Sequence, residues 1–416
     1  MQTLPGFRDF LPADCASRNY IFDTWRKVAR AYGFVEWDGP VLEPTELYRK
    51  KSGPEIVDQL FNFVDKGERE VAMRPELTPT LARVVAANER SFKKPLKWFS
   101  IGQFFRYEKQ QRGRLREHYQ LNCDILGEAG PAADVELVAL CVDVLRGFGL
   151  TEKDFVVRIS DRGFWTEFLE QRKVPPENWT AILQAIDKSE REPREKTAAK
   201  LGPLADAIFE VFDRGGRSQR LDEVVAALGA RGLGEFVEVD VQIVRGLAYY
   251  TGVVFEAFDR AGKLRALAGG GRYDNLVQQL SEGAVSMPAL GFAMGDVVLG
   301  ELLKIAPSAT GKLSRAVEAY GNLDAFVVIA KEERRSDALA IMQRLRESGL
   351  RVDYSFGATK IAKQFQAAEH LGARAALIFG DEWPQIAMKD LRSGKQELIG
   401  QEELLSRVKA LLGAEL

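Results

Sequence analysis

The sequence has few of the residues on which metal sites and disulfide frameworks depend. It contains two histidines, His118 and His370, and three cysteines. Cys15, Cys123 and Cys141 cannot all pair, and their spacing matches no metal-ligand pattern, so we expect reduced structural thiols. Because only two histidines are present and they are far apart in the sequence, a histidine-rich metal site or a serine-histidine triad is largely excluded. Catalysis must therefore rest on other groups.

Long apolar runs are also missing, and the first residues do not show the pattern of a leader segment. The longest apolar stretches, 326–330 and 375–379, are far shorter than the roughly 20 residues that cross a bilayer. The N-terminus has acidic residues and no basic stretch leading into an apolar one. We therefore predict a cytoplasmic protein without a secretory signal or membrane partner. The net charge is −2, so binding to nucleic acid would have to come from local basic clusters.

Length and composition are those of a globular protein with more than one folding unit. The chain has 416 residues, of which 46% are hydrophobic and 28% charged, whereas one domain ordinarily holds roughly 100 to 200 residues. Residues 161–237 are helix formers without a strand pattern, so we predict a helical insertion. Residues 1–160 and 238–320 would form one α+β domain around an antiparallel sheet, and residues 324–416 a small α/β domain with a parallel or mixed sheet. Residues 304–322 have the composition of a linker.

Local patterns predict the elements of the main domain. Apolar residues at helical spacing predict a first helix that ends near Tyr32. A hairpin is expected to turn at Lys66 and Gly67. The other expected elements are a helix over 77–87, two antiparallel strands within 97–127 joined by a basic arm, and strands over 237–244 and 252–258.

The segment 97–127 carries the most informative chemistry. Arg106, on a strand, can bind phosphate or carboxylate oxygens through two nitrogens, although an ordinary surface salt bridge also accounts for it. The arm that follows is basic and polar, so it suits binding to a nucleic-acid backbone. The alternative interpretation is a charged loop that is exposed to solvent and binds nothing. The groups of this arm are Lys109, Gln110, Gln111, Arg112, Arg114 and Arg116.

Two further segments offer groups that suit a polar ligand. The glycines 269–271 permit either a close approach of backbone to a ligand or a tight turn between strand and helix. They form no P-loop, because no lysine-serine or lysine-threonine pair follows. In VRGLAYYTGVVFE, Arg245 precedes Tyr249 and Tyr250, which offer a cation and phenolic hydroxyls. Aromatic packing within a strand is the alternative.

Together these segments resemble class II aminoacyl-tRNA synthetases, and specifically the histidyl enzymes. YGFVEWDGPVLEPTELY is similar to motif 1, with Pro40 as its proline, AMRPELTPTLAR to the substrate-binding TLRPE segment, and FRYEKQQRGRLREHYQ to motif 2. RGLAYYTGVVFE and AGGGRYD resemble two stretches diagnostic of histidyl enzymes, and the region from Asp324 resembles their anticodon-binding domain. The resemblance implies ATP, L-histidine and tRNA(His) as substrates, Mg²⁺ with the ATP, and a homodimer built on motif 1.

The resemblance also implies roles for individual residues. Arg106 would hold the α-phosphate of ATP and the charge that develops at the reacting phosphorus. Arg245 would bridge the histidine carboxylate and the α-phosphate, and Glu108 would contribute to ATP binding. The expected contacts to the α-amino group of histidine are Glu76, Thr78 and Gln120, and those to its imidazole are Asp124 and Tyr250. Tyr249 is also expected to bind histidine. The expected contacts to the tRNA acceptor end are Gln111, Arg112, Arg114 and Arg116.

Three positions depart from the family pattern. Val298 stands where motif 3 ordinarily has an arginine that contacts the γ-phosphate, Ala248 where many relatives carry aspartate, and Asp124 where the usual residue is glutamate. The departures keep two other functions open: a non-catalytic paralogue that resembles the regulatory subunit of ATP phosphoribosyltransferase, and an RNA-binding or sensor protein on the same scaffold. The basic arm and the region from Asp324 favour the ligase, since regulatory paralogues generally lack that domain.

Overall fold

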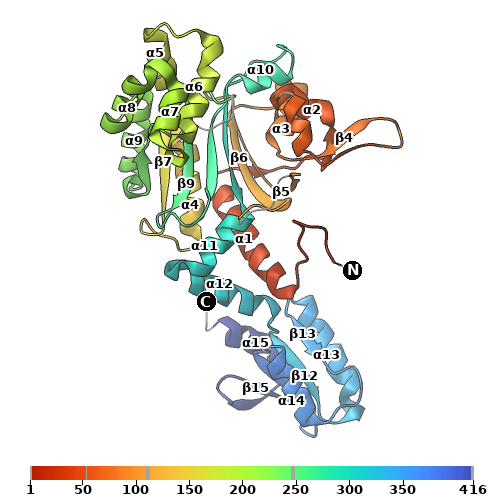
Figure 1. The fold of residues 1–416 in the computed structure, drawn as a ribbon. Coiled ribbons are helices and arrows are strands. Elements are labelled where there is room, and N and C mark those ends of the chain that lie inside the picture. The colour runs from red at the N-terminus through yellow and green to blue at the C-terminus, as the bar shows by residue number, and fades with distance from the viewer. Residues whose placement is uncertain (1, 53, 108–112, 245–248, 414–416) are drawn as a thin grey trace. The chain divides into compact units, whose positions relative to one another are not determined.

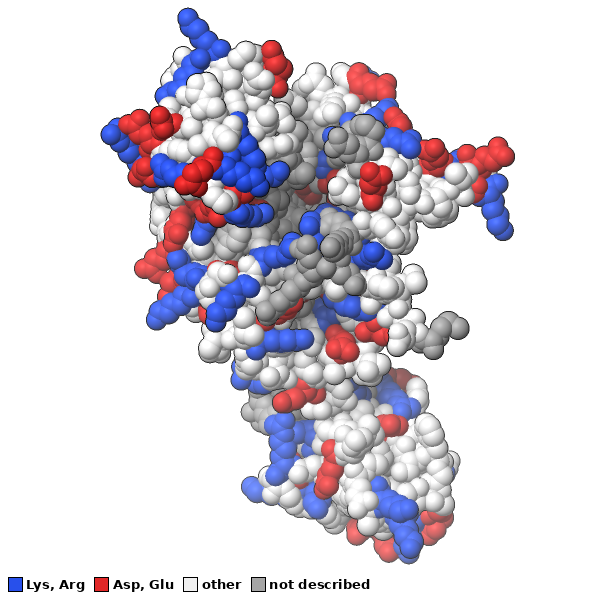
Figure 2. All heavy atoms as spheres, in the orientation of Figure 1, with Lys and Arg blue, Asp and Glu red and all other residues white. Residues whose placement is uncertain are grey.

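The computed structural model describes residues 2–52, 54–107, 113–244 and 249–413. The chain forms two compact units: unit 1 comprises residues 1–10 and 17–313, and unit 2 comprises residues 11–16 and 314–416. Within the described ranges, no helix combines the length and apolarity needed to cross a bilayer. Basic and acidic side chains are interspersed on the face drawn in Figure 2, in keeping with the small net charge.

Unit 1 is organised around a sheet that is antiparallel except at its two edges (Figure 1). β1 pairs with β5 and β7 with β8 in parallel, and the pairs between them are antiparallel. The predicted α+β class with an antiparallel core is therefore confirmed. In spatial order the strands are β1 (Val35–Glu36), β5 (Leu96–Phe105), β6 (Glu117–Leu126), β11 (Ala289–Gly295), β10 (Ala268–Arg272), β9 (Val253–Asp259), β7 (Phe155–Asp161) and β8 (Val237–Val239).

Helices α4 (Pro131–Gly147) and α11 (Asp296–Ile305) pack against the middle of this sheet. Proline in the first turn of α4 suits a helix start, since that position needs no backbone N–H. Side chains alternate along β6, so one face carries the buried residues Leu121, Cys123 and Ile125 and the other carries polar residues. The predicted first helix is α1 (Pro12–Ala31), which ends just before the expected position.

A second, smaller sheet contains the predicted hairpin. β2 (Leu42–Pro44), β4 (Glu70–Met73) and β3 (Asn62–Val64) are antiparallel, which confirms the hairpin. Its turn is fixed by Asp65, whose Oδ1 accepts hydrogen bonds from the backbone N–H groups of Gly67 and Arg69 at 2.8 and 3.0 Å. The helices that gather beside it are α2 (Thr45–Ser52), α3 (Thr78–Ala87) and α10 (Leu276–Leu280).

Between β7 and β8 the chain forms a group of helices, shown in yellow to green in Figure 1. The first four of these helices share a core around Trp165, whose indole N–H donates to the carbonyl of Val241 at 2.8 Å, whereas the fifth packs against α4. The helices are α5 (Arg162–Gln171), α6 (Pro176–Lys188), α7 (Arg194–Leu201), α8 (Ala205–Arg214) and α9 (Gln219–Ala230).

Unit 2 has a mixed sheet, as predicted. In the order β13-β12-β14-β15-β16, the first two pairs are parallel and the last two antiparallel. The strands are β12 (Ala325–Ile329), β13 (Val352–Tyr354), β14 (Ala375–Phe379), β15 (Ile386–Asp390) and β16 (Gln396–Ile399), and the helices are α13 (Arg335–Glu347), α14 (Ile361–His370) and α15 (Leu404–Gly413). The β15–β16 hairpin is not predicted from the sequence, because charged residues around its turn obscure the strand pattern.

Two local predictions are wrong, and one of two alternative interpretations is excluded. Residues 304–322 are mostly helix, because α12 (Pro307–Gly321) begins at a proline and buries Ala309 and Leu313. The strand expected over 237–244 ends at Val239, and Val241 and Val244 beyond it pack into the core of the helical group. The glycines 269–271 form strand β10 rather than a turn.

Candidate active site

Unit 1 contains a cavity of about 890 Å³ over the open face of the central sheet. On β6, every second residue lines it with a polar side chain, namely His118, Gln120, Asn122 and Asp124. On the neighbouring strands β10 and β11, small residues line it, among them Gly269, Gly291 and Ala293. Small residues beside polar ones leave space for a ligand above the sheet. The volume lies within the roughly 300 to 1,000 Å³ of small-molecule sites.

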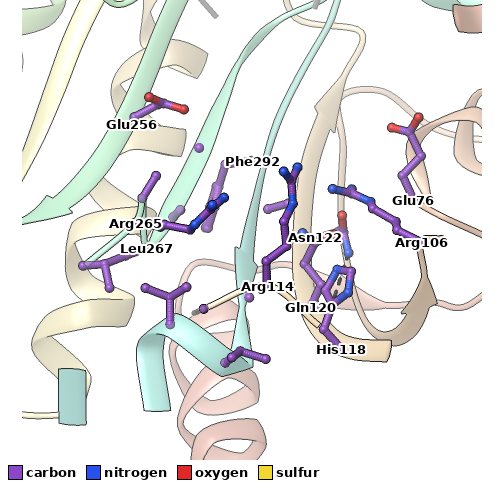
Figure 3. A pocket seen from close by; sticks show the side chains of 18 of the residues that line it. Glu76, Arg106, Arg114, His118, Gln120, Asn122, Glu256, Arg265, Leu267 and Phe292 are labelled. Carbon is purple, nitrogen blue, oxygen red and sulfur yellow. Dashed lines mark hydrogen bonds between the residues drawn. The ribbon is translucent and has the colours of Figure 1, made fainter. Parts of the chain in front are cut away.

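Arg106 and Glu76 approach the cavity from one edge (Figure 3). Arg106 directly follows β5, and its Nε donates to the carbonyl of Pro75 at 3.0 Å. The neighbouring Arg74 is buried and donates from Nε to a carbonyl of β5 at 3.0 Å. These contacts tie the end of β5 to the segment that carries Glu76. Thr78, at the start of α3, lines the same cavity.

Lys51 of α2 is a buried cation beside Glu76. Its side chain is 1% exposed and forms an ion pair with Glu76, and its Nζ lies 4.2 Å from the ring centre of Tyr249. Burial lowers the pKa of Lys51, and the carboxylate of Glu76 opposes that shift. Tyr249 also packs against Tyr250 and Tyr273, with ring centres 4.7 and 6.0 Å apart. An acid, a base and three aromatic rings are thus grouped at this part of the cavity.

Asp124 is a buried carboxyl group in the middle of β6. It accepts a hydrogen bond from the hydroxyl of Tyr273 at 2.5 Å. Burial raises the pKa of Asp124 to about 7, although the Tyr273 hydrogen bond and the charge of Lys51 act to lower it. Gly291 provides the space for this carboxyl, because a Cβ at that position would overlap its Oδ1. The group therefore titrates near neutral pH, well above the ordinary range of an aspartate.

Arginines dominate the other part of the cavity. Figure 3 shows Arg114 and Arg265 extending into the space above the sheet, with Arg106 across from them. Burial lowers the pKa of His118 to about 3, and the positive charges of Arg106, Arg8 and Arg114 add to the shift. His118 is uncharged at neutral pH, and the same positive charges favour an anionic ligand.

The structure brings most of the expected ligand-binding residues to this cavity, namely Glu76, Thr78, Arg106, Arg114, Gln120, Asp124, Tyr249 and Tyr250. Arg116 does not line it, and its guanidinium lies 4.3 Å from the ring centre of Tyr107 instead. The expected residues Glu108, Gln111, Arg112 and Arg245 lie outside the described residues, as do Lys109, Gln110 and Ala248.

Several cavity residues escape the sequence analysis. The segment HYQLNCD places polar groups at every second position, and this alternation was a usable signal for His118 and Asn122. Tyr273 and Arg265, which line the cavity, and Lys51, which pairs with Glu76 of the cavity, come from three separate segments. No local pattern relates those segments to β6, so the sequence alone does not predict that these residues lie near it. The three-dimensional structure is needed to identify them.

Nothing in the described ranges forms a cluster of three or more histidine, cysteine or acidic side chains that would hold a metal ion. The cysteines are free, as predicted, with Cys123 and Cys141 buried. The described cavity therefore offers cations and hydrogen-bonding groups rather than a set of metal ligands.

Comparison with known proteins shows the family to which the chain belongs. A family model described as histidyl-tRNA synthetase matches residues 6–296, and one described as an anticodon binding domain matches residues 324–411. The histidine–tRNA ligase of Opitutus terrae is 44% identical, over 98% of each chain. The crystal structure of histidyl-tRNA synthetase from Nostoc sp. PCC 7120 shares the fold, with a TM-score of 0.76 at 24% identity over 98% of this chain and 99% of that one. The apo enzyme from S. aureus gives a TM-score of 0.73 at 25% identity, over 98% and 100% of the two chains. This chain belongs to the histidyl-tRNA synthetase family.

Proposed function

We propose that this protein ligates L-histidine to tRNA(His) in an ATP-dependent reaction, through a histidyl-adenylate intermediate. The observation that carries the proposal is one cavity that combines a buried carboxyl and tyrosine cluster with several arginines. The first part suits an imidazole and an ammonium group, and the second suits phosphates. Relatives that cover nearly the whole chain are histidine–tRNA ligases, which supports the same reaction.

The acidic and aromatic part of the cavity would bind histidine. Asp124 would accept a hydrogen bond from the imidazole, with Tyr249 and Tyr250 beside the ring. Lys51 would hold Glu76 in position through their ion pair. The groups around the α-amino group would be Glu76, Thr78 and Gln120, because a carboxylate and neutral acceptors suit an ammonium ion.

The arginine-rich part of the cavity would bind ATP. Arg106 would contact the α-phosphate, and its hydrogen bond to Pro75 would fix the direction of its guanidinium. Arg245 and Glu108 are assigned ATP contacts by family resemblance alone. ATP would enter as its Mg²⁺ complex, with the phosphates as the main ligands, since Mg²⁺ commonly binds through substrate phosphates, waters and one or two carboxylates.

The reaction requires no covalent bond to the protein. A carboxylate oxygen of histidine attacks the α-phosphorus, the bond from that phosphorus to the bridging oxygen breaks, and pyrophosphate leaves. A ribose hydroxyl at the 3′ end of tRNA then attacks the carbonyl carbon and loses its proton, and AMP leaves. The chain contributes orientation and charge neutralisation, which are the main sources of catalysis in such transfers.

Further proposals concern tRNA and the organisation of the chain. The acceptor end would contact Gln111, Arg112, Arg114 and Arg116. Residues 324–416 would bind the anticodon region, residues 1–160 and 238–320 would form the catalytic domain, and residues 161–237 an insertion in it. A homodimer would form through the motif 1 segment, where Val35, Val41 and Leu42 are exposed apolar residues available to an isologous interface. The mass from solution scattering at micromolar concentration tests this assembly, and a monomer would contradict it.

The decisive experiment is histidine-dependent exchange of labelled pyrophosphate into ATP, followed by charging of tRNA(His) with labelled histidine. Both reactions are expected with the purified protein. Protein that binds histidine without exchanging pyrophosphate would instead be a regulatory paralogue. Exchange that depends on a different amino acid would refute the assignment of Asp124 to an imidazole.

A further inference from the structure

Val298 introduces an apolar side chain into the arginine-rich part of the cavity. It belongs to α11, is 8% exposed and lines the cavity wall. A valine offers no hydrogen-bond donor to a phosphate, so this wall needs a cation from another segment if it is to contact a nucleotide.

Arg265 lies next to that valine. A Cβ built on Gly113 would be 3.3 Å from Cγ2 of Val298 and 3.6 Å from Cδ of Arg265, so both side chains flank the same point of the backbone. Both residues line the cavity. In Figure 3 the guanidinium of Arg265 extends from the β9–β10 connection into the same space as that of Arg114. A cation therefore lies beside the apolar position.

The connection that carries Arg265 is structurally constrained. The buried carboxylate of Asp259 accepts hydrogen bonds from the backbone N–H groups of Lys263 at 3.0 Å and Leu264 at 2.9 Å. Leu267 is buried, and its N–H donates to the carbonyl of Ala257 at 2.7 Å. Arg265 stands between these fixed points. Its backbone is therefore positioned before a ligand arrives, which reduces the entropy lost on binding.

We propose that Arg265 contacts the β- and γ-phosphates of ATP and supplies the positive charge that Val298 cannot. This inference rests on the proposed function. Arg106 approaches the cavity across from Arg265, so these two guanidinium groups would contact the triphosphate from opposite sides. Arg114 lies between them in Figure 3. A guanidinium suits this task because it stays charged and binds phosphate oxygens through two nitrogens.

The test compares Arg265→Met with Lys263→Met in the full-length protein. Both variants remove one positive charge from the same connection, but Lys263 does not line the cavity. Arg265→Met is expected to lower kcat/KM for ATP in pyrophosphate exchange by about 10- to 100-fold, the effect of losing a charge-assisted hydrogen bond. The KM for histidine should stay unchanged, and Lys263→Met should behave as the wild type. Adding Val298→Arg to Arg265→Met should recover much of the loss, because it returns a guanidinium to the same corner.

Two results would overturn the inference. One is kcat/KM for ATP in Arg265→Met equal to that of Lys263→Met. The other is an equal loss for ATP and histidine with a lowered Tm, which would mean that Arg265 only supports the fold. A wild-type protein without histidine-dependent exchange would refute the proposed function itself, whereas an active wild type with an unaffected Arg265→Met variant refutes only this inference.

Discussion

The hydroxyl of Tyr273 donates a hydrogen bond to Oδ1 of Asp124 at 2.5 Å, in the wall of the cavity. The two residues come from distant parts of the chain, and both are buried. Burial raises the pKa of Asp124 to about 7, and it raises the pKa of Tyr273 as well. Tyr273 therefore remains a neutral donor, while Asp124 changes charge in the pH range where the enzyme would work.

The titration of Asp124 predicts how histidine binding depends on pH. Its carboxyl group gains negative charge as pH rises through about 7, and a charged acceptor binds an imidazole N–H more strongly than a neutral one. The KM for histidine should fall roughly fivefold to tenfold between about pH 6 and about pH 8. Asp124→Asn should abolish this component, since an amide does not titrate. Tyr273→Phe should move it to higher pH, because the variant lacks a hydrogen bond that lowers the pKa of Asp124.

The measurement is the KM for histidine in pyrophosphate exchange across that pH range. Free histidine titrates near pH 6.5 in every assay, so the difference between wild type and Asp124→Asn isolates the contribution of the protein. Parallel profiles for the two proteins would show that Asp124 does not contact the imidazole.

Arg106 should act on the chemical step of adenylate formation. Arg106→Met removes a cation positioned for the α-phosphate, and loss of one such group typically slows a reaction by roughly 10² to 10³-fold. The rate of Arg106→Lys should lie between those of the wild type and Arg106→Met, because lysine keeps the charge but loses the hydrogen bond from Nε to the carbonyl of Pro75. Single-turnover formation of histidyl adenylate gives the rates, and an unchanged rate in Arg106→Met would assign this residue a structural role only.

The segment AGGGRYD shows where sequence analysis of the site reaches its limit. Three consecutive glycines disfavour a strand, yet they form β10 because β9 and β11 supply hydrogen-bonding partners on both sides. A Cβ at Gly270 would overlap the carbonyl of Gly291, so close packing of strands accounts for this glycine. The arginine that follows the glycines does not line the cavity.

That arginine, Arg272, should stabilise the fold. It forms a two-nitrogen ion pair with Asp134, at 3.1 Å from Nε and 2.9 Å from Nη2, and both side chains are 1% exposed. Arg272→Met would leave a buried carboxylate without its hydrogen-bonded cation, with only Arg220 at 3.9 Å, and should lower the free energy of unfolding by about 3 to 5 kcal/mol. Urea unfolding followed by tryptophan fluorescence measures the change. Asp134→Leu added to this variant should recover part of the loss, and an unaltered urea midpoint in Arg272→Met would contradict the prediction.

The parts of the fold that follow from local patterns were predictable, and the parts set by distant contacts were not. Alternation along β5 and β6 and helical spacing in α1 reflect one buried face each, so the sequence alone reveals them. Arg106 was a candidate from its side-chain chemistry and its place beside a strand, whereas its role and Asp124 were identified through family motifs. Tyr273 and Arg265 line the same cavity as β6, and Lys51 pairs with Glu76 beside it, only because of the tertiary fold, and no property of their own segments predicts this proximity.

Removal of residues 324–416 should separate the two reactions of the enzyme. The described residues proposed to bind ATP and histidine lie in unit 1, and residues 324–416 belong to unit 2. The truncated protein is therefore expected to retain most of its pyrophosphate exchange and to lose most of its tRNA charging. Circular dichroism and the mass in solution must first show that the truncated protein is folded and assembled as the full chain is. An equal loss in both reactions would contradict the division of labour.

A single substitution on the surface of unit 2 tests its role in tRNA binding while leaving the chain at full length. Phe356 is 86% exposed, and its ring lies 5.4 Å from that of Tyr354. Lys360 and Lys363, at the start of α14, follow it closely in sequence and are exposed. An exposed aromatic ring can stack on an unpaired base while nearby lysines contact phosphates, and such stacking contributes roughly 1 to 3 kcal/mol per base. Phe356→Ala should therefore raise the KM for tRNA(His) by about 5- to 100-fold and leave pyrophosphate exchange unchanged. Leu398→Ala, at another exposed apolar position of unit 2, is the control, and an equal effect of the two variants on the KM for tRNA would place the anticodon contact elsewhere.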